Sequence, residues 1–116
     1  MREFHHVGLP TDQPQEGETY VPETKVWVTD PLKHPYRVEY LRYEPDSPVT
    51  GPLRDRPHLA FRTDHLAAEL AGKEVILGPF RPMPGLQVAF IVQDGAVFEF
   101  MEWDPEDAPT EGAWGR

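Results

Sequence analysis

The sequence HVGLPTD at residues 6–12 returns as HLAFRTD at residues 58–64. Both copies place a histidine, an aliphatic residue, a very small residue and a bulky apolar residue in the same order, and both end in Thr-Asp. The histidines, at 6 and 58, are 52 residues apart. Self-similarity of this kind indicates a duplicated structural unit, and we interpret each copy as a β-strand.

A second pair of matched segments follows these strands. VWVTD at 26–30 leads to VEYL at 38–41, and FIVQD at 90–94 leads to FEFM at 98–101. The glutamates of this pair, at 39 and 99, are 60 residues apart, and we assign the extra eight residues to loops. The order of a histidine strand, a hairpin and a glutamate strand therefore occurs twice.

The second half reads as a βαβββ unit. Residues 64–72 favour a short helix, which Thr63 or Asp64 can cap and Gly72 can end. A strand over 73–77 is expected to stop at Gly78-Pro79, and a hairpin turns at Asp94-Gly95. The fold class predicted is α+β, with two tandem βαβββ modules.

In the first half, Pro14, Gly17 and Pro22 stand where the helix of that module belongs, so we expect this helix to be degraded. The 116 residues suffice for one core. We therefore expect a single domain over 1–102, with repeat one at about 3–44, a linker at about 45–56 and repeat two at about 57–102. The acidic, Pro- and Gly-rich residues 103–116 are interpreted as a flexible tail.

Composition excludes several classes of function. The formal net charge of −9 opposes binding to nucleic acid. The sequence has no apolar run near the roughly 18 residues that a membrane helix needs, and no signal-peptide pattern at its start. It contains no cysteine, which excludes disulfides and thiolate metal sites. A cytoplasmic location fits these features.

The duplication brings four residues to equivalent positions: His6 and His58 on the first strands, Glu39 and Glu99 on the last. Because side chains alternate along a strand, each histidine and glutamate points away from the apolar residues beside it. Gly8 and Ala60 leave room next to the histidines. Two imidazoles and two carboxylates suit a divalent cation such as Zn, Ni, Mn, Fe or Co. We therefore predict a metal site made of all four residues.

Other polar residues were weighed against these. His5 competes with His6, but strand alternation groups it with Val7 and Leu9, and we interpret His5, His34 and His65 as structural or solvent-exposed. Arg37 and Arg62 are expected to share strand faces with Glu39 and His58. They could contact an anionic substrate or pair with neighbouring acids.

The duplicated βαβββ pattern with these residues resembles the vicinal oxygen chelate superfamily, which groups glyoxalase, bleomycin-resistance and dioxygenase-like proteins. The most similar segments are HVGL at 6–9 and GAVFEF at 95–100. The resemblance implies a curved, mixed, glyoxalase-like sheet, and a set of two histidines and two glutamates looks like that of glyoxalase I. The sequence departs from glyoxalase I in its missing first helix and its shorter length.

The resemblance also implies an activity. We expect a metal-dependent isomerase, epimerase or lyase in which a divalent cation stabilises the enediolate of a small substrate with neighbouring oxygens. Glu99 or Glu39 would be the catalytic base. The alternative is a protein of the same superfamily that binds or sequesters small molecules without chemistry. Relatives are commonly homodimers, and a homodimer is expected here too.

Overall fold

The computed structural model of the chain describes residues 2–105. In this part, eight strands are joined by loops, two short α-helices and one turn of 3₁₀-helix. The elements are β1 (Arg2–Pro10), β2 (Thr19–Val21), β3 (Val26–Val28), the 3₁₀ turn η1 (Pro31–Lys33), β4 (Val38–Tyr43), α1 (Pro52–Asp55), β5 (His58–Thr63), α2 (Leu66–Leu70), β6 (Glu74–Met83), β7 (Leu86–Gln93) and β8 (Ala96–Trp103).

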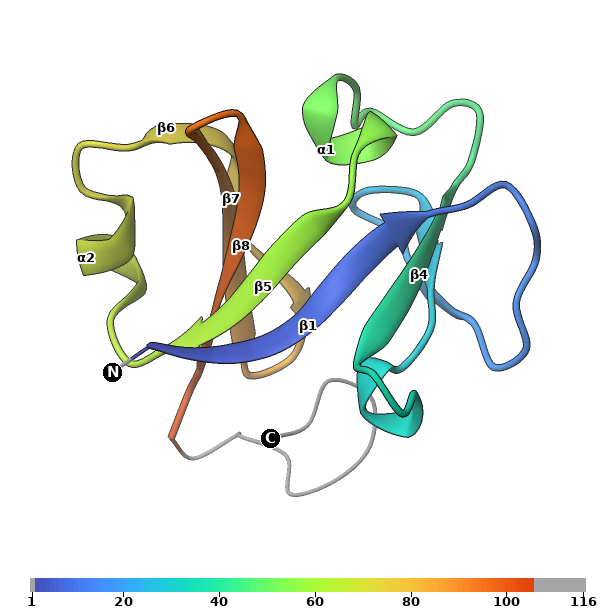
Figure 1. The fold of residues 1–116 in the computed structure, drawn as a ribbon, viewed down its shortest axis with the longest axis horizontal. Coiled ribbons are helices and arrows are strands. Elements are labelled where there is room, and N and C mark those ends of the chain that lie inside the picture. Colours follow the sequence, from blue (N-terminus) through green and yellow to red (C-terminus); the bar gives the residue numbers. More distant parts are fainter. Residues whose placement is uncertain (1, 106–116) are drawn as a thin grey trace.

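The strands form one curled mixed sheet in the order β2-β3-β4-β1-β5-β8-β7-β6 (Figure 1). At its centre β1 and β5 are antiparallel, and each is also parallel to the last strand of its own half, β4 or β8. The first four strands and the last four thus repeat one arrangement about the β1–β5 seam. The predicted α+β fold with two related modules in a curved mixed sheet is confirmed.

The first module lacks a helix between its first two strands, as expected. Residues 11–18 form only turns and bends. Pro14 has no backbone donor for a helical hydrogen bond, and Gly17 adopts a φ of 76° that a helix does not permit. Because no helix covers them, Val7 and Tyr40 on the outer face of this module are only half-buried.

The helix of the second module is shorter than the 64–72 predicted, and its start was assigned wrongly. Neither Thr63 nor Asp64 caps it, since His65 is the N-cap residue and makes no side-chain capping bond. The backbone N–H of Leu66 donates instead to the carboxylate of Glu102, at 2.6 Å. A distant strand therefore supplies the acceptor that the local sequence was expected to provide. Gly72, with a φ of 72°, follows the helix as predicted.

Two other elements differ from expectation. β6 continues through Gly78-Pro79, where we expected it to stop. It is an edge strand, so Pro79 can lack a ladder donor there, and its pairing with β7 shifts register between Leu77 and Phe80. The linker at 45–56 contains the short helix α1, which buries Leu53 against the sheet.

The main core lies on the inner, concave face of the sheet. It contains Val28, Leu41 and Val88, among others, and the four histidine and glutamate residues point to this same face. A smaller core, with Leu66 and Ile91, lies under α2 on the outer face. We expected the histidines and glutamates to face away from the apolar layer, and that was wrong. The flanking strands β2, β3, β6 and β7 supply inner apolar residues that the local pattern of β1 and β5 does not reveal.

The last strand reaches further than the predicted domain end at residue 102. Trp103 is buried and pairs with Leu86, and the backbone N–H of Asp104 donates to the carbonyl of Gly85 at 2.8 Å. Residue 103, which we assigned to the tail, is thus the last residue of β8, and residues 106–116 lie outside the described part. Within residues 2–105, none of the helices has the length and apolar character needed to cross a bilayer.

Candidate metal centre

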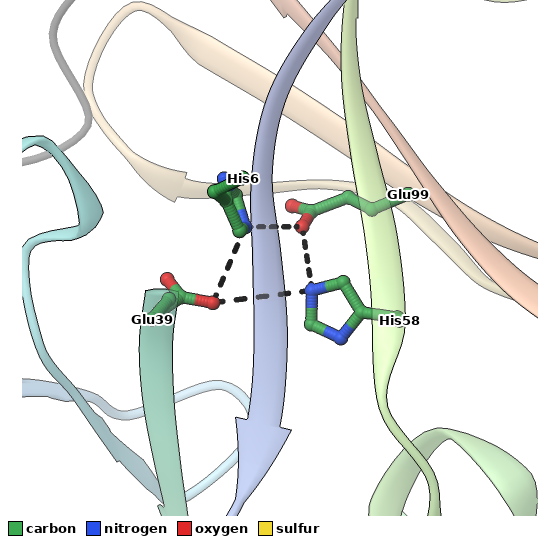
Figure 2. Close-up of side chains that lie close together, drawn as sticks. All are labelled: His6, Glu39, His58 and Glu99. Carbon is green, nitrogen blue, oxygen red and sulfur yellow. Dashed lines mark hydrogen bonds and ion pairs between the residues drawn. The ribbon is translucent and has the colours of Figure 1, made fainter. Parts of the chain in front are cut away.

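His6, Glu39, His58 and Glu99, which we call the His–Glu cluster, come from four adjacent strands of the sheet. These strands are β1, β4, β5 and β8, two from each module. Figure 2 shows the four side chains pointing toward one another. The repeat therefore predicted correctly that these residues converge.

The strand register explains how four bulky side chains fit on one small area of sheet. Gly8 is the partner of Glu39 on one side and of His58 on the other. Ala60 is likewise the partner of both His6 and Glu99. Each large side chain thus has a very small neighbour on the adjacent strand, and it can lean over that neighbour toward the centre of the cluster.

Gly8 is required for this arrangement. A Cβ added at Gly8 would lie 2.5 Å from both ring nitrogens of His58. Real Cβ atoms do not approach other heavy atoms so closely, so the His58 ring occupies the space of a side chain at position 8. On its other side the ring packs edge-to-face on Phe90, with 5.3 Å between ring centroids.

The nitrogen–oxygen separations in the cluster are close to those that a bound cation imposes. His6 Nε2 is 3.4 Å from Glu39 Oε1 and 3.3 Å from Glu99 Oε1. His58 Nε2 is 3.1 Å from Glu99 Oε1 and 3.9 Å from Glu39 Oε1. All four residues are buried, and one donor atom from each lies within 4.8 Å of the others. Bonds of about 2.0–2.2 Å to a central ion place neighbouring ligand atoms roughly 3–4 Å apart.

The hydrogen bonding of the histidines also fits a cation. His6 Nε2 is buried and makes no hydrogen bond among the described residues, although it points to the centre of the cluster. A buried polar nitrogen without a partner costs free energy. A divalent cation would supply that partner and would balance the two buried carboxylates. The residues present therefore fit a divalent metal, and the structure does not distinguish among Zn, Ni, Mn, Fe and Co.

Electrostatic interactions within the cluster are strong. Burial alone would lower the pKa of His6, but the neighbouring Glu39 and Glu99 carboxylates outweigh it and raise that pKa to about 10. Burial alone would raise the pKa of Glu99, but the neighbouring imidazoles of His58 and His6 lower it to about 2. A proton on His6 thus takes the place of a cation at neutral pH.

His5 contacts a residue of the cluster, which the sequence did not reveal. Its Nδ1 lies 2.7 Å from Nδ1 of His6, and both rings are buried. The pairing of β1 with β5 is irregular between Phe4 and His6, which breaks the alternation that grouped His5 with Val7 and Leu9. Arg37 donates from Nη1 to the carbonyl of His5, at 3.2 Å. A bulge of this kind depends on the partner strand, so the sequence of β1 alone could not predict it.

The remaining candidates lie apart from the centre of the cluster. Arg37 is exposed and adopts a φ of 59° just before β4, so the strand face expected for it does not apply. Arg62 is half-buried on β5. His65 is exposed, and His34 accepts a hydrogen bond from the backbone of Tyr36.

A hollow opens beside the cluster on the concave face. It encloses about 400 Å³, part of which is open to solvent, and both Glu39 and Glu99 line it. Tyr43 lines it too, on the same face of β4 as Glu39. Burial, together with the charges of Glu39 and Glu99, raises the pKa of Tyr43, so its hydroxyl keeps its proton and can donate a hydrogen bond. The repeat did not mark Tyr43, because Trp103, its counterpart in the second module, differs from it.

Comparison with known proteins bears on the fold. Several solved structures share it, among them the following two. The hypothetical protein BH1468 from Bacillus halodurans C-125 is 18% identical, with a TM-score of 0.63 over 87% of this chain and 94% of that one. Methylmalonyl-CoA epimerase from Mycobacterium tuberculosis is 16% identical, with a TM-score of 0.61 over 90% of this chain and 89% of that one. No family model and no curated protein matches the sequence. At these identities the likeness concerns the fold alone.

Proposed function

We propose that this protein is a metal-dependent enzyme of the vicinal oxygen chelate superfamily, acting as an isomerase, epimerase or lyase on a small molecule with two neighbouring oxygens. One observation carries the proposal: two buried imidazoles and two buried carboxylates offer their donor atoms within 4.8 Å of one another beside a hollow. The fold shared with methylmalonyl-CoA epimerase agrees with an enzyme of this kind.

His6, Glu39, His58 and Glu99 would hold the cation from one side, because all four extend from the floor of the concave face. The other side then faces the hollow, where a substrate can approach. A bound divalent cation supplies Lewis acidity, which stabilises negative charge on a substrate oxygen and acidifies the neighbouring C–H group. The protein contributes orientation and a site that excludes most water.

A carboxylate would move the proton. Glu99 and Glu39 both line the hollow, so an oxygen of either can reach a substrate bound there. The depressed pKa of Glu99 keeps it ionised at neutral pH, as a base must be. We assign the role of base to one of these two residues, and the Glu→Gln variants of each decide between them.

Metal content is the first test. Protein purified without chelators is expected to carry close to one divalent cation per chain by inductively coupled plasma mass spectrometry. A His58→Ala variant should lose it, and a His65→Ala variant should keep it, because His65 is exposed and outside the cluster. Wild-type protein that holds no cation, even after soaking at neutral pH, would remove the enzyme proposal and favour a metal-free binding protein.

Chemistry is tested by proton exchange. Small α-hydroxyketones and hydroxyaldehydes are incubated with metal-loaded protein in D₂O, and loss of the C–H signal is followed by NMR. We expect exchange well above that of the free cation. If Glu99 is the base, Glu99→Gln should abolish exchange of the substrate C–H; if Glu39 is the base, Glu39→Gln should do so. Unchanged exchange in both variants would exclude both glutamates from that role.

A further inference from the structure

The hollow beside the His–Glu cluster has two chemically different parts. Its floor is formed by Glu39 and Glu99 of the cluster, and its wall is formed by the other lining residues. Fourteen of the described residues line the hollow, and among these fourteen only Glu39 and Glu99 are charged. Ten of the others are Val, Leu, Phe or Pro, and only Thr24 and Tyr43 carry hydroxyls. Within the described residues, no lysine or arginine contributes to this lining.

The cations that stand next to lining residues in the sequence are engaged elsewhere. Lys25, between Thr24 and Val26, pairs with Asp46, with 2.5 Å between Nζ and Oδ2. Arg81, between Phe80 and Pro82, pairs with Asp104 at 2.9 Å. Arg42, between Leu41 and Tyr43, pairs with Glu18 at 2.6 Å. Each of these side chains is held by an acid that does not line the hollow.

Arg54 is the remaining cation close to the wall, and Tyr43 separates it from the hollow. Its guanidinium lies 5.6 Å from the centroid of the Tyr43 ring. Its Nη1 and Nη2 donate to the carbonyls of Val49 and Glu44, at 3.4 Å and 3.2 Å. Arg54 therefore directs two of its donors to the backbone and does not line the hollow.

The charges at the floor balance without any contribution from a substrate. Two carboxylates neutralise one divalent cation when the two imidazoles are neutral. A further charge carried into an apolar, narrow space would be desolvated without a partner, which is strongly unfavourable.

From this arrangement we infer that the substrate is a compact, uncharged molecule with an apolar body, which reaches the cluster through its two neighbouring oxygens. Substrates that carry a phosphate, a free carboxylate or a large charged carrier on the body would be rejected. The inference rests on the proposed metal site and deepens it. It predicts selectivity by charge at the apolar wall, which the cluster by itself does not impose.

Three hydroxamates with the same chelating head test this selectivity on protein loaded with one equivalent of Zn²⁺. Hexanohydroxamic acid has a neutral tail, adipic acid monohydroxamate ends in a carboxylate, and 6-aminohexanohydroxamic acid ends in an ammonium group. Affinity is measured by isothermal titration calorimetry, so no activity is needed. The neutral tail is expected to bind at least tenfold more tightly than either charged tail.

A single substitution is expected to reverse the preference for the neutral tail. Phe80 is half-buried and lines the hollow, so Phe80→Lys introduces the absent cation. It should raise affinity for the carboxylate tail about tenfold and weaken binding of the neutral tail. Phe98→Lys is the matched control, because Phe98 is also half-buried but packs against the smaller core under α2. It should leave all three affinities unchanged.

The outcomes separate the two proposals. Failure to retain Zn²⁺, or retention without binding of acetohydroxamic acid, removes the metal centre and this inference together. Retention of Zn²⁺ with equal or tighter binding of the carboxylate tail overturns the inference and leaves the metal centre standing. Tighter binding of the neutral tail, lost in Phe80→Lys, supports both.

Discussion

The Nδ1 atoms of His5 and His6 lie 2.7 Å apart, although the two residues are consecutive on one strand. This contact leaves Nε2 of His6 directed at the cluster, and one of the two Nδ1 atoms must carry the hydrogen that they share. Partners of this kind orient histidines in metal sites and raise their basicity, and their loss typically lowers metal affinity about 10- to 100-fold.

The first prediction concerns His5. His5→Ala should lower metal affinity by about 10- to 100-fold while all four residues of the cluster remain. Competition with a metal-sensing dye measures the affinity, and circular dichroism shows whether the fold is retained. His34→Ala is the control, since His34 contacts Tyr36 and lies apart from the cluster. Wild-type affinity in a folded His5→Ala protein would show that His5 has no positioning role.

A second prediction concerns Gly8. Gly8→Ala would force the His58 ring to move, because the new Cβ would lie 2.5 Å from its nitrogens. We expect a loss of about 1–3 kcal/mol in the free energy of unfolding, as for overpacked cores, together with weaker metal binding. Urea denaturation measures the first quantity and calorimetry the second. Val7→Ile enlarges the outer face of the same strand and should change neither.

The third prediction concerns the proton that His6 loses when a cation binds. His6, with a pKa of about 10, is protonated near pH 7 in the metal-free protein, and a cation can bind only after this proton leaves. Binding should therefore release about one proton per cation, and affinity should rise with pH until about pH 10. Calorimetry in two buffers of different ionisation enthalpy counts the released protons. Identical binding enthalpies in the two buffers would contradict the prediction.

The fourth prediction concerns Glu102, whose loss should lower the stability of the fold without changing metal affinity. Glu102→Ala removes the acceptor at the start of α2 and should cost about 1 kcal/mol, as other N-terminal capping bonds do. Metal affinity should stay unchanged, because Glu102 lies on the opposite face of β8 from Glu99. Thermal denaturation with and without metal measures both effects. A large loss of metal affinity would mean that α2 and the cluster are coupled.

The fifth prediction concerns association. Leu59 is 38% exposed and Phe4 47% exposed on neighbouring strands of the outer face, which is costly for an isolated chain. We expect a homodimer by light scattering after size-exclusion chromatography. Leu59→Glu should weaken it, whereas Val75→Glu, a change at a similarly exposed residue of the edge strand β6, should not. A wild-type monomer at high concentration would disprove this expectation.

The duplication made the central strands and the cluster predictable, because two matched segments restrict each other's interpretation. The equivalence of His6 with His58, and of Glu39 with Glu99, followed from sequence position alone. The bulge that buries His5 and the distant acceptor that Glu102 offers to Leu66 could not be predicted in this way. Both depend on how neighbouring strands align. The course of β6 through Pro79 depends on its place at the sheet edge, which local residues do not encode.

The two modules differ in how much structure they hold. β2 and β3 have three residues each, and no helix of the described residues covers the outer face of their module, whereas β7 and β8 have eight each and lie beneath α2. Amide hydrogens should therefore exchange with solvent sooner in the first module than in the second. His6 and Glu39 belong to the first module, and His58 and Glu99 belong to the second. A bound cation would therefore link the first module to the second, which we expect to be better protected from amide exchange. Slower exchange in β1 and β4, with little change in β7 and β8, would show that the cation determines how often half of the molecule opens.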